Sequence, residues 1–240
     1  MSELVLFCGG ASIYPIEKPK PLTLMPNTLT LIETYLSLTP LKQISQVTLI
    51  AESDFFNEIE EVAGMFNDES NQFRVLLTPN HSSTLSKLQY FLSSNISKSP
   101  NLLFSYPDVF YFGNWERLFT QDKMMISGVY LQTRFPEINF NPYTSKIHSL
   151  NLKPPRVPAN SSTIYAGHFS GKLQDIAGAL RLFDETRSNI LNPTLEGEFF
   201  RFLVSQGSLT VNILDGTWIK ADSDKERLAI VNLLKRQNGE

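Results

Sequence analysis

Two glycines and a lysine held between prolines follow the first apolar run of the chain. Gly9 and Gly10 come directly after Leu4–Cys8, and Lys20 lies between two prolines ten residues further on. Glycines let a ligand approach the backbone closely and leave N–H groups to bind it. A lysine on a stiff, extended segment is suited to hold a phosphate as a point charge. These residues fit a phosphate-binding loop, and they also fit a plain turn beside a solvated lysine.

The elements that would position this loop alternate between strands and helices over roughly the first 110 residues. We expect strands at Leu4–Cys8, Val47–Ala51, Phe73–Leu77 and Leu102–Tyr106, and helices at Thr30–Leu38, Phe55–Phe66 and Leu85–Ile96. Strands that alternate with helices of this length form a parallel sheet covered on both faces. Ligands of such sheets bind outside the carboxyl ends of the strands, which is where the glycines lie.

The second half of the chain has a mixed pattern. We expect strands at Ile126–Thr133, Lys146–Leu152, Thr163–Phe169 and Leu209–Leu214, and helices at Lys172–Arg187 and Thr194–Ser205. Ser223 and Glu226 have the spacing of a capping box, which opens a last helix. No linker and no internal repeat interrupts the sequence. We therefore predict a single α/β domain over residues 1–240, a three-layer α/β/α sandwich with a mostly parallel mixed central sheet.

Composition and charge exclude several classes of protein. The chain has 240 residues, of which 42% are hydrophobic, and a formal net charge of −3. An acidic chain is not a general nucleic-acid binder, so local cations, backbone N–H groups or a metal must hold any anionic ligand. The single cysteine, Cys8, can form neither an internal disulfide nor a zinc site. The sequence has no secretory signal and no run of about 20 apolar residues, so we expect a cytoplasmic protein that does not span a membrane.

The order of motifs at the start of the chain resembles a known family. A strand, Gly-Gly, Pro-Lys-Pro-Leu and a helix with Leu31-Ile32-Glu33 resemble the N-terminal signature of nucleotidyltransferases that act on sugar 1-phosphates and related phosphorylated alcohols. That signature runs G-G-x-G-[ST]-R-L-x-P-x-T-x-x-x-P-K-P-L, followed by a Pro-Leu-Ile-Glu helix start. The resemblance implies a Rossmann-like fold of the nucleotide-diphospho-sugar transferase type. Residues 1–112 would then bind the nucleotide, and residues 113–240 would bind the acceptor.

The resemblance continues, in order, down nearly the whole chain. Thr84 matches the Gly-Thr-Ala helix start after the family's base-recognition loop, with Ser83 in place of the glycine. Asp108 matches the metal-binding aspartate of the family's Gly-Asp, with Pro107 in place of the glycine. The segment Gly216–Ser223 resembles the terminal Trp-x-[Asp/Glu]-Ile-Asp-Thr, which supplies a second metal-binding aspartate.

Three further segments resemble the family's acceptor-binding motifs. Lys153 lies in a match to Glu-Lys-Pro, Gly167 in a match to Ala-Gly-Ile-Tyr, and Glu198 in a match to a Gly-Glu stretch near the sugar. The resemblance therefore implies that Lys153 faces the acceptor's phosphate and that Gly167 and Glu198 border the acceptor pocket. Each has an ordinary structural reading beside it; Lys153, for example, also fits a solvated loop lysine.

The chain departs from the family pattern at two positions that bear on phosphate and metal binding. The glycine loop is about four residues shorter, Ile13-Tyr14 stands where the family has its triphosphate-binding arginine, and the first arginine of the chain is Arg74. In the thymidylyl- and uridylyltransferase branch the second metal aspartate would fall at Lys220. In branches that end Glu-Ile-Asp-Thr it falls at Asp222, which we assign; this placement favours a cytidylyltransferase-like branch.

The reaction that the resemblance implies is transfer of a nucleoside monophosphate from a nucleoside triphosphate to a phosphorylated acceptor, with release of pyrophosphate. Mg²⁺ would be held by Asp108 and Asp222. Lys20 would hold phosphate, while Gly9 and Gly10, together with Ser83 and Thr84, would bind the nucleotide. The partners would be the triphosphate and a small phosphorylated acceptor, and a homodimer is compatible with the sequence.

Two other functions stay open. The same scaffold, without the loop arginine, would suit a nucleotide- or nucleotide-sugar-binding regulatory protein with little or no catalysis. A glycosyltransferase of the related fold should carry an Asp-x-Asp metal motif at a strand end. Asp222-Ser223-Asp224 has that spacing but lies late in the chain, against a helix cap.

Overall fold

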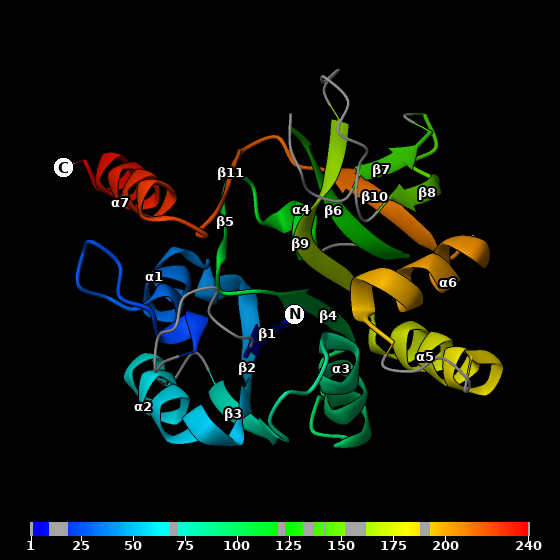
Figure 1. The fold of residues 1–240 in the computed structure, drawn as a ribbon, viewed down its shortest axis with the longest axis horizontal. Coiled ribbons are helices and arrows are strands. Elements are labelled where there is room, and N and C mark those ends of the chain that lie inside the picture. Colours follow the sequence, from blue (N-terminus) through cyan, green and yellow to red (C-terminus); the bar gives the residue numbers. More distant parts are fainter. Residues whose placement is uncertain are drawn as a thin grey trace. The chain divides into compact units, whose positions relative to one another are not determined.

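The chain divides into two compact units, each made of segments that are distant in the sequence. The computed structural model describes residues 2–9, 19–67, 72–119, 123–131, 137–141, 143–151, 162–187 and 193–239 (Figure 1). Unit 1 comprises Met1–Ser82, Ser105–Phe112 and Gly216–Glu240, and unit 2 comprises Ser83–Phe104 and Gly113–Asp215. The resemblance implied a nucleotide-binding half over residues 1–112 and an acceptor-binding half over residues 113–240, and the two units have other boundaries. The single domain with two functional halves stays a prediction.

Unit 1 is built on three parallel strands. Its strands are β1 (Ser2–Cys8), β2 (Ile44–Glu52), β3 (Gln72–Thr78), β5 (Val109–Phe112) and β11 (Thr217–Lys220). Its helices are α1 (Leu31–Leu38), α2 (Phe56–Phe66) and α7 (Asp224–Asn238), with short turns of 3₁₀ helix at η1 (Lys20–Leu22), η2 (Leu41–Gln43) and η3 (Ser53–Phe55). In Figure 1, α1 and α2 lie beside the β1–β2–β3 sheet.

The register of this sheet aligns the carboxyl ends of its strands. Cys8 lies opposite Ala51, and Ala51 lies opposite Leu77, so β1, β2 and β3 end at the same edge. Strand β1 is buried over its whole length, as expected for a parallel strand covered on both faces. Loops that follow these strands therefore emerge at one edge, where ligands of open α/β sheets bind.

A buried ion pair ties the three strands together near their amino ends. The Glu3 side chain on β1 is fully buried, and its Oε1 accepts hydrogen bonds from Thr48 Oγ1 on β2 and from an Arg74 guanidinium nitrogen on β3, each at 2.6 Å. Arg74 Nε in turn donates to Thr48 Oγ1 at 2.7 Å. A buried carboxylate is costly without such partners, so this network constrains the order and register of β1–β3.

Unit 2 carries a mixed sheet. Its strands are β4 (Asn101–Ser105), β6 (Met124–Leu131), β7 (Glu137–Phe140), β8 (Ile147–Asn151), β9 (Ser162–Lys172) and β10 (Leu209–Ile213). Its helices are α3 (Thr84–Ser93), α4 (Glu116–Phe119), α5 (Leu173–Arg187), a turn of π-helix, η4 (Leu195–Phe199), and α6 (Phe200–Ser205). Strand β9 pairs antiparallel with both β4 and β6, and β10 pairs parallel with β6.

The core of unit 2 is rich in phenylalanine. The rings of Phe104 and Phe169 stack at 5.8 Å between centroids, and Phe169 contacts Phe200 at 5.2 Å. Phe183 on α5 meets Phe199 edge to face at 5.5 Å. Such pairs add to the free energy gained from burying the rings, so these aromatics join the π-helical segment and α5 into one core.

The predicted fold class is confirmed: the protein is α/β, with a mixed, mostly parallel sheet flanked by helices. The predicted capping box also forms, since Ser223 Oγ accepts from the Glu226 N–H and the Glu226 carboxylate accepts from the Ser223 N–H. Among the residues that the structure describes, no helix is both long enough and apolar enough to cross a membrane.

Candidate functional site

Lys20 is presented by a short, well-anchored turn. Pro19 and Pro21 fix the backbone on either side, and the turn closes with hydrogen bonds from Leu22 N–H to Pro19 C=O at 3.0 Å and from Thr23 N–H to Lys20 C=O at 3.1 Å. Leu22 is buried and anchors the turn against unit 1. Lys20 therefore projects from a rigid backbone, as its position between prolines predicts.

Asp108 lies in the tight turn that precedes β5. The Val109 N–H donates to the Tyr106 carbonyl at 3.1 Å, which closes the turn. Tyr35 of α1 holds both sides of it: its hydroxyl donates to Ser105 Oγ at 2.9 Å, and its ring meets Phe110 edge to face at 5.9 Å. The position of Asp108 is thus set by the core of unit 1.

Asp222 lies between β11 and α7, and both neighbours fix it. Strand β11 pairs antiparallel with β5, and the Ala221 N–H donates to the Asp108 carbonyl at 2.8 Å. At the start of α7, Glu226 Oε2 accepts hydrogen bonds from the N–H groups of Asp222 at 3.1 Å and Ser223 at 2.8 Å. The backbone thereby brings the second aspartate beside the first.

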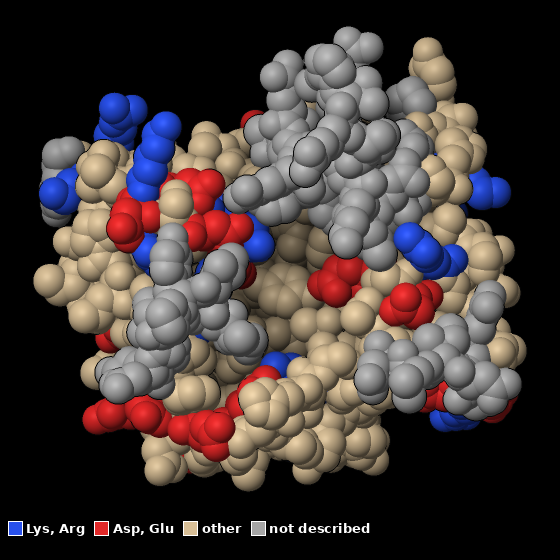
Figure 2. Space-filling model, viewed as in Figure 1, with Lys and Arg blue, Asp and Glu red and all other residues tan. Residues whose placement is uncertain are grey.

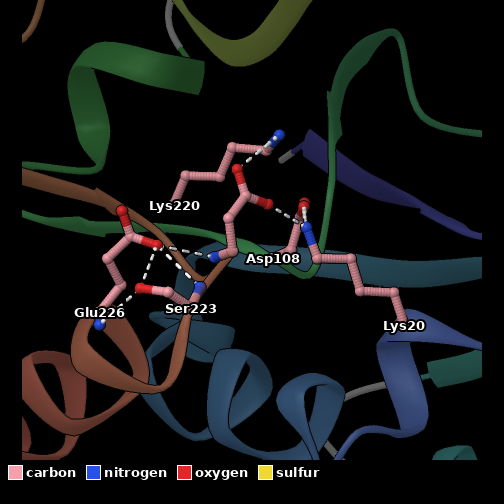
Figure 3. A network of polar contacts seen from close by, with 6 residues as sticks. Lys20, Asp108, Lys220, Ser223 and Glu226 are labelled. Atoms are coloured by element: carbon pink, nitrogen blue, oxygen red, sulfur yellow. Dashed lines mark hydrogen bonds and ion pairs between the residues drawn. The ribbon is translucent and has the colours of Figure 1, made fainter. Parts of the chain in front are cut away.

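The three side chains meet in one network (Figure 3). Lys20 Nζ lies 2.5 Å from Asp108 Oδ2 and also contacts Asp222 Oδ1. A second lysine joins from β11, with Lys220 Nζ 3.1 Å from Asp222 Oδ2. Acidic and basic side chains gather over β11 and the beginning of α7, on the face seen in Figure 2. Lys20 is therefore in direct contact with both Asp108 and Asp222, although the three residues were assigned from three distant motifs.

Lys20 and Asp222 are both charged at neutral pH. Burial disfavours the ammonium form of Lys20, but the Asp108 charge and hydrogen bonds to both aspartates outweigh it and raise the pKa of Lys20. Burial likewise disfavours the carboxylate of Asp222, but the hydrogen bond from Lys20 and the charge of Lys220 lower its pKa below the ordinary value. The cluster is an ionic one, with two lysines around two carboxylates.

The donor set of this cluster fits a magnesium ion that is bound together with a phosphorylated ligand. Mg²⁺ is typically held by one or two carboxylates plus substrate phosphates and water. The Asp108 and Asp222 carboxylates share a common contact point, now taken by Lys20 Nζ. Within the described part of the chain, no group of three or more His, Cys, Asp or Glu side chains could hold a metal alone. A metal here would depend on oxygens from the ligand.

The glycine pair is described only in part. Gly9 follows β1 at the carboxyl edge of the sheet and is half-buried. Gly10 lies outside the described residues, as does the rest of the loop up to residue 18. Lys153 also lies outside the described residues. The nucleotide role of Gly9 and Gly10 and the acceptor role of Lys153 stay predictions.

The predicted nucleotide residues of unit 2 lie at the start of α3. Ser83 is the N-cap: its Oγ accepts from the Ser86 N–H at 3.1 Å and donates to the Pro193 carbonyl at 3.2 Å. Thr84 Oγ1 lies 3.4 Å from Glu196 Oε2. Ser83 therefore has a structural task at the helix terminus, and its contact with a nucleotide is still a prediction.

The predicted acceptor residues of unit 2 are Gly167 on β9 and Glu198 in the π-helical turn. Gly167 has φ +83°, a left-handed conformation that favours glycine. Glu198 Oε2 accepts from the Thr194 N–H at 2.7 Å and from Thr194 Oγ1 at 2.9 Å, and the backbone hydrogen bond lowers its pKa. Both residues have local structural reasons for their identity. Their contact with an acceptor stays a prediction.

Lys220 is the member of the cluster that the sequence did not single out as a site residue. In the sequence, Lys220 stands out only as a lysine where one branch of the resembled family has its second metal aspartate. A usable signal was its position two residues before Asp222, because Lys220 ends β11 and Asp222 lies in the short segment that follows this strand. Because β11 pairs with β5, the end of β11 lies beside Asp108, and this pairing brings Lys220 into the cluster.

Comparison with known proteins supports the fold. No protein-family model and no curated protein matches the chain. Among solved structures, the crystal structure of HddC from Yersinia pseudotuberculosis superposes with a TM-score of 0.75 over 98% of this chain and 100% of that one, at 12% sequence identity. The two chains share one α/β fold, and at this identity the likeness concerns the fold alone.

Proposed function

We propose that this protein is a Mg²⁺-dependent nucleotidyltransferase that transfers a nucleoside monophosphate to a sugar phosphate or a similar phosphorylated acceptor and releases pyrophosphate. The observation that carries the proposal is the contact of Lys20 with both Asp108 and Asp222. These residues come from three segments distant in the sequence, and each was assigned from its own motif. The contact supports the proposal because such a reaction needs carboxylates that hold a metal ion and a cation that neutralises phosphate charge.

The chemistry needs positioning and charge neutralisation more than covalent participation by the protein. An oxygen of the acceptor's phosphate attacks the α-phosphorus in line, and pyrophosphate leaves. Asp108 and Asp222 would hold the metal ion, which when bound neutralises charge on the phosphate oxygens. Lys20 would donate to the α-phosphate or to the leaving pyrophosphate. Gly9 and Gly10 would lie against the nucleoside.

The test is a screen for pyrophosphate release. The protein is incubated with Mg²⁺, each nucleoside triphosphate in turn and a panel of phosphorylated acceptors that includes sugar 1-phosphates. We expect pyrophosphate from one combination of triphosphate and acceptor. Binding of triphosphates without release from any combination would refute transfer, and would favour the second candidate below.

Replacement of one aspartate tests the site assignment. Asp108→Asn removes a carboxylate charge while keeping its shape, so turnover should fall by about 100-fold or more with the fold retained. Asp224→Asn is the matched control, because the Asp224 side chain is 97% exposed and lies two residues after Asp222. Steady-state rates and thermal unfolding of both variants give the comparison. Turnover that survives in Asp108→Asn would contradict the assignment of Asp108.

A nucleotide- or nucleotide-sugar-binding protein on the same scaffold is the second candidate. The observation that favours it is the presence of two lysines on the two carboxylates, which compete with a metal for the same oxygens. Such a protein would bind its ligand through the same cluster without completing the transfer. Equilibrium binding measured beside the pyrophosphate screen separates the two candidates.

A further inference from the structure

We propose that Lys220 is a phosphate-binding residue of this site, which holds an oxygen of a polyphosphate chain with its ammonium group. The proposal deepens the proposed function, because it assigns a further residue to the same site. It starts from the place of Lys220 in the backbone. Lys220 is the last residue of β11 and lies opposite Val109 of β5, directly beside the turn that carries Asp108.

The side chain of Lys220 occupies the outer edge of the cluster. Lys20 contacts one oxygen of the Asp222 carboxylate, and Lys220 lies 3.1 Å from the other. The exposed fraction of the side chain is 32% for Lys220 but 12% for Asp222. A ligand that approaches from solvent therefore meets the ammonium of Lys220 before it meets the more buried Asp222. The Asp222 carboxylate holds this ammonium in place.

The charge balance of the cluster gives Lys220 a function beyond its ion pair. Two carboxylates and one lysine would present a net negative charge to an anionic ligand, and the second lysine brings the cluster to neutrality. Once a divalent cation is on the carboxylates, the same lysine raises the positive charge that faces the phosphates. A partly exposed lysine–aspartate pair adds little to stability by itself, so charge at the site is its larger contribution.

Lysine chemistry suits this task. An ammonium on a flexible stem carries three donors, so binding a phosphate oxygen does not require Lys220 to leave Asp222. The shortened glycine loop contains no arginine, and the first arginine of the chain, Arg74, is paired with Glu3. Lys20 and Lys220 are the basic side chains in contact with the two aspartates in the described part of the chain.

The test measures binding of inorganic tripolyphosphate in the presence of Mg²⁺ by titration calorimetry. Lys220→Met removes the ammonium and keeps a long side chain, so its affinity for tripolyphosphate should fall by about tenfold, the worth of one charge-assisted hydrogen bond. Lys225→Met is the matched control, since Lys225 is exposed in the first turn of α7, and its affinity should stay that of the wild type. Lys220→Arg, which keeps a positive charge at this position, should bind tripolyphosphate with most of the wild-type affinity.

The outcomes separate this proposal from the proposed function. Tripolyphosphate has neither base nor acceptor, so its binding does not depend on transfer. Equal affinity of Lys220→Met and the wild type, with both folded in thermal unfolding, overturns the assignment of Lys220 even where pyrophosphate is released from a triphosphate. A tenfold loss supports it even where no transfer occurs. Should Lys220→Met fail to fold, Lys220→Gln takes its place in the same comparison.

Discussion

Lys20 lies where two carboxylates would otherwise repel each other. Its ammonium contacts Asp108 and Asp222 at the point that a divalent cation would also take. In the proposed function, lysine and metal would therefore compete for the same oxygens, and a metal would bind only as Lys20 moves aside. A phosphate chain offers Lys20 a new partner, so ligand binding and metal binding should favour each other at this residue.

This competition predicts a gain of function in metal binding. Lys20→Met removes the competing cation, so the protein without nucleotide should bind Mn²⁺ about tenfold more tightly than the wild type. Electron paramagnetic resonance of free Mn²⁺ measures the affinity, with Lys225→Met as the control for loss of a surface charge. An unchanged or weaker affinity of Lys20→Met would show that Lys20 does not compete with a metal.

Two small elements hold the aspartates in place. The antiparallel pair β5–β11 joins the turn of Asp108 to the segment of Asp222, and the capping box of α7 holds that segment from the other side. Glu226 serves both purposes, because its carboxylate accepts hydrogen bonds from Ser223 and from the Asp222 N–H. The first turn of α7 is therefore part of the site's support.

The capping carboxylate should thus influence both stability and binding. Glu226→Ala leaves the N–H groups of Asp222 and Ser223 without this acceptor, and we expect a loss of about 1 kcal/mol in unfolding free energy, or roughly 2–4 °C in melting temperature. The affinity for tripolyphosphate should fall as Asp222 loses its support. Glu33→Ala at the capping box of α1 is the control: a similar loss of stability without weaker binding would assign the binding effect to Glu226.

Local patterns predicted most elements of both units. The apolar run Leu4–Cys8 became β1, the spacing from Phe55 to Phe66 became α2, and Ser223 caps α7 as its spacing from Glu226 indicated. These signals are short-range, since each depends on a few neighbouring residues. Most boundaries moved by one or two positions. The larger shifts are at α3, which ends at Ser93 rather than at Ile96, at β2, which begins at Ile44 rather than at Val47, and at β9, which ends at Lys172 rather than at Phe169.

The elements that complete the site were not predictable in the same way. Strands β5 and β11 have four residues each, too few for a periodic pattern, and each is defined by a partner far away in the sequence. The helix expected at Thr194–Ser205 begins as a π-helical turn, which apolar spacing does not distinguish from an α-helix. Lys220 joins the ionic cluster only through these long-range pairings.

At the scale of the whole molecule, one buried histidine links stability to pH. His168 on β9 is 1% exposed and meets Trp115 edge to face at 6.2 Å between ring centroids. Burial lowers the pKa of His168 to about 4. Between pH 4 and the ordinary value near 6.5, the unfolded chain takes up a proton there and the folded chain does not, so stability falls as the pH falls through this window.

Removal of the histidine should remove that pH dependence. In urea unfolding, the wild type should lose about 2 kcal/mol more between pH 7.5 and pH 5 than His168→Gln, which has no group titrating at this position. His148→Gln, at an exposed position of β8, is the control and should behave as the wild type. Identical pH dependence in all three proteins would contradict a neutral, buried His168.

The composition of unit 1 sets the order in which the site can be assembled. Lys20 and Asp222 are separated by 202 positions in the sequence. The third segment of unit 1, Gly216–Glu240, follows the residues of unit 2 in the sequence. During synthesis on the ribosome, Lys20 and Asp108 emerge long before Asp222 and Lys220. The β1–β2–β3 sheet can form from local contacts, whereas the ionic cluster requires a long loop to close. The nascent chain therefore carries no complete cluster until the segment Gly216–Glu240 has been made.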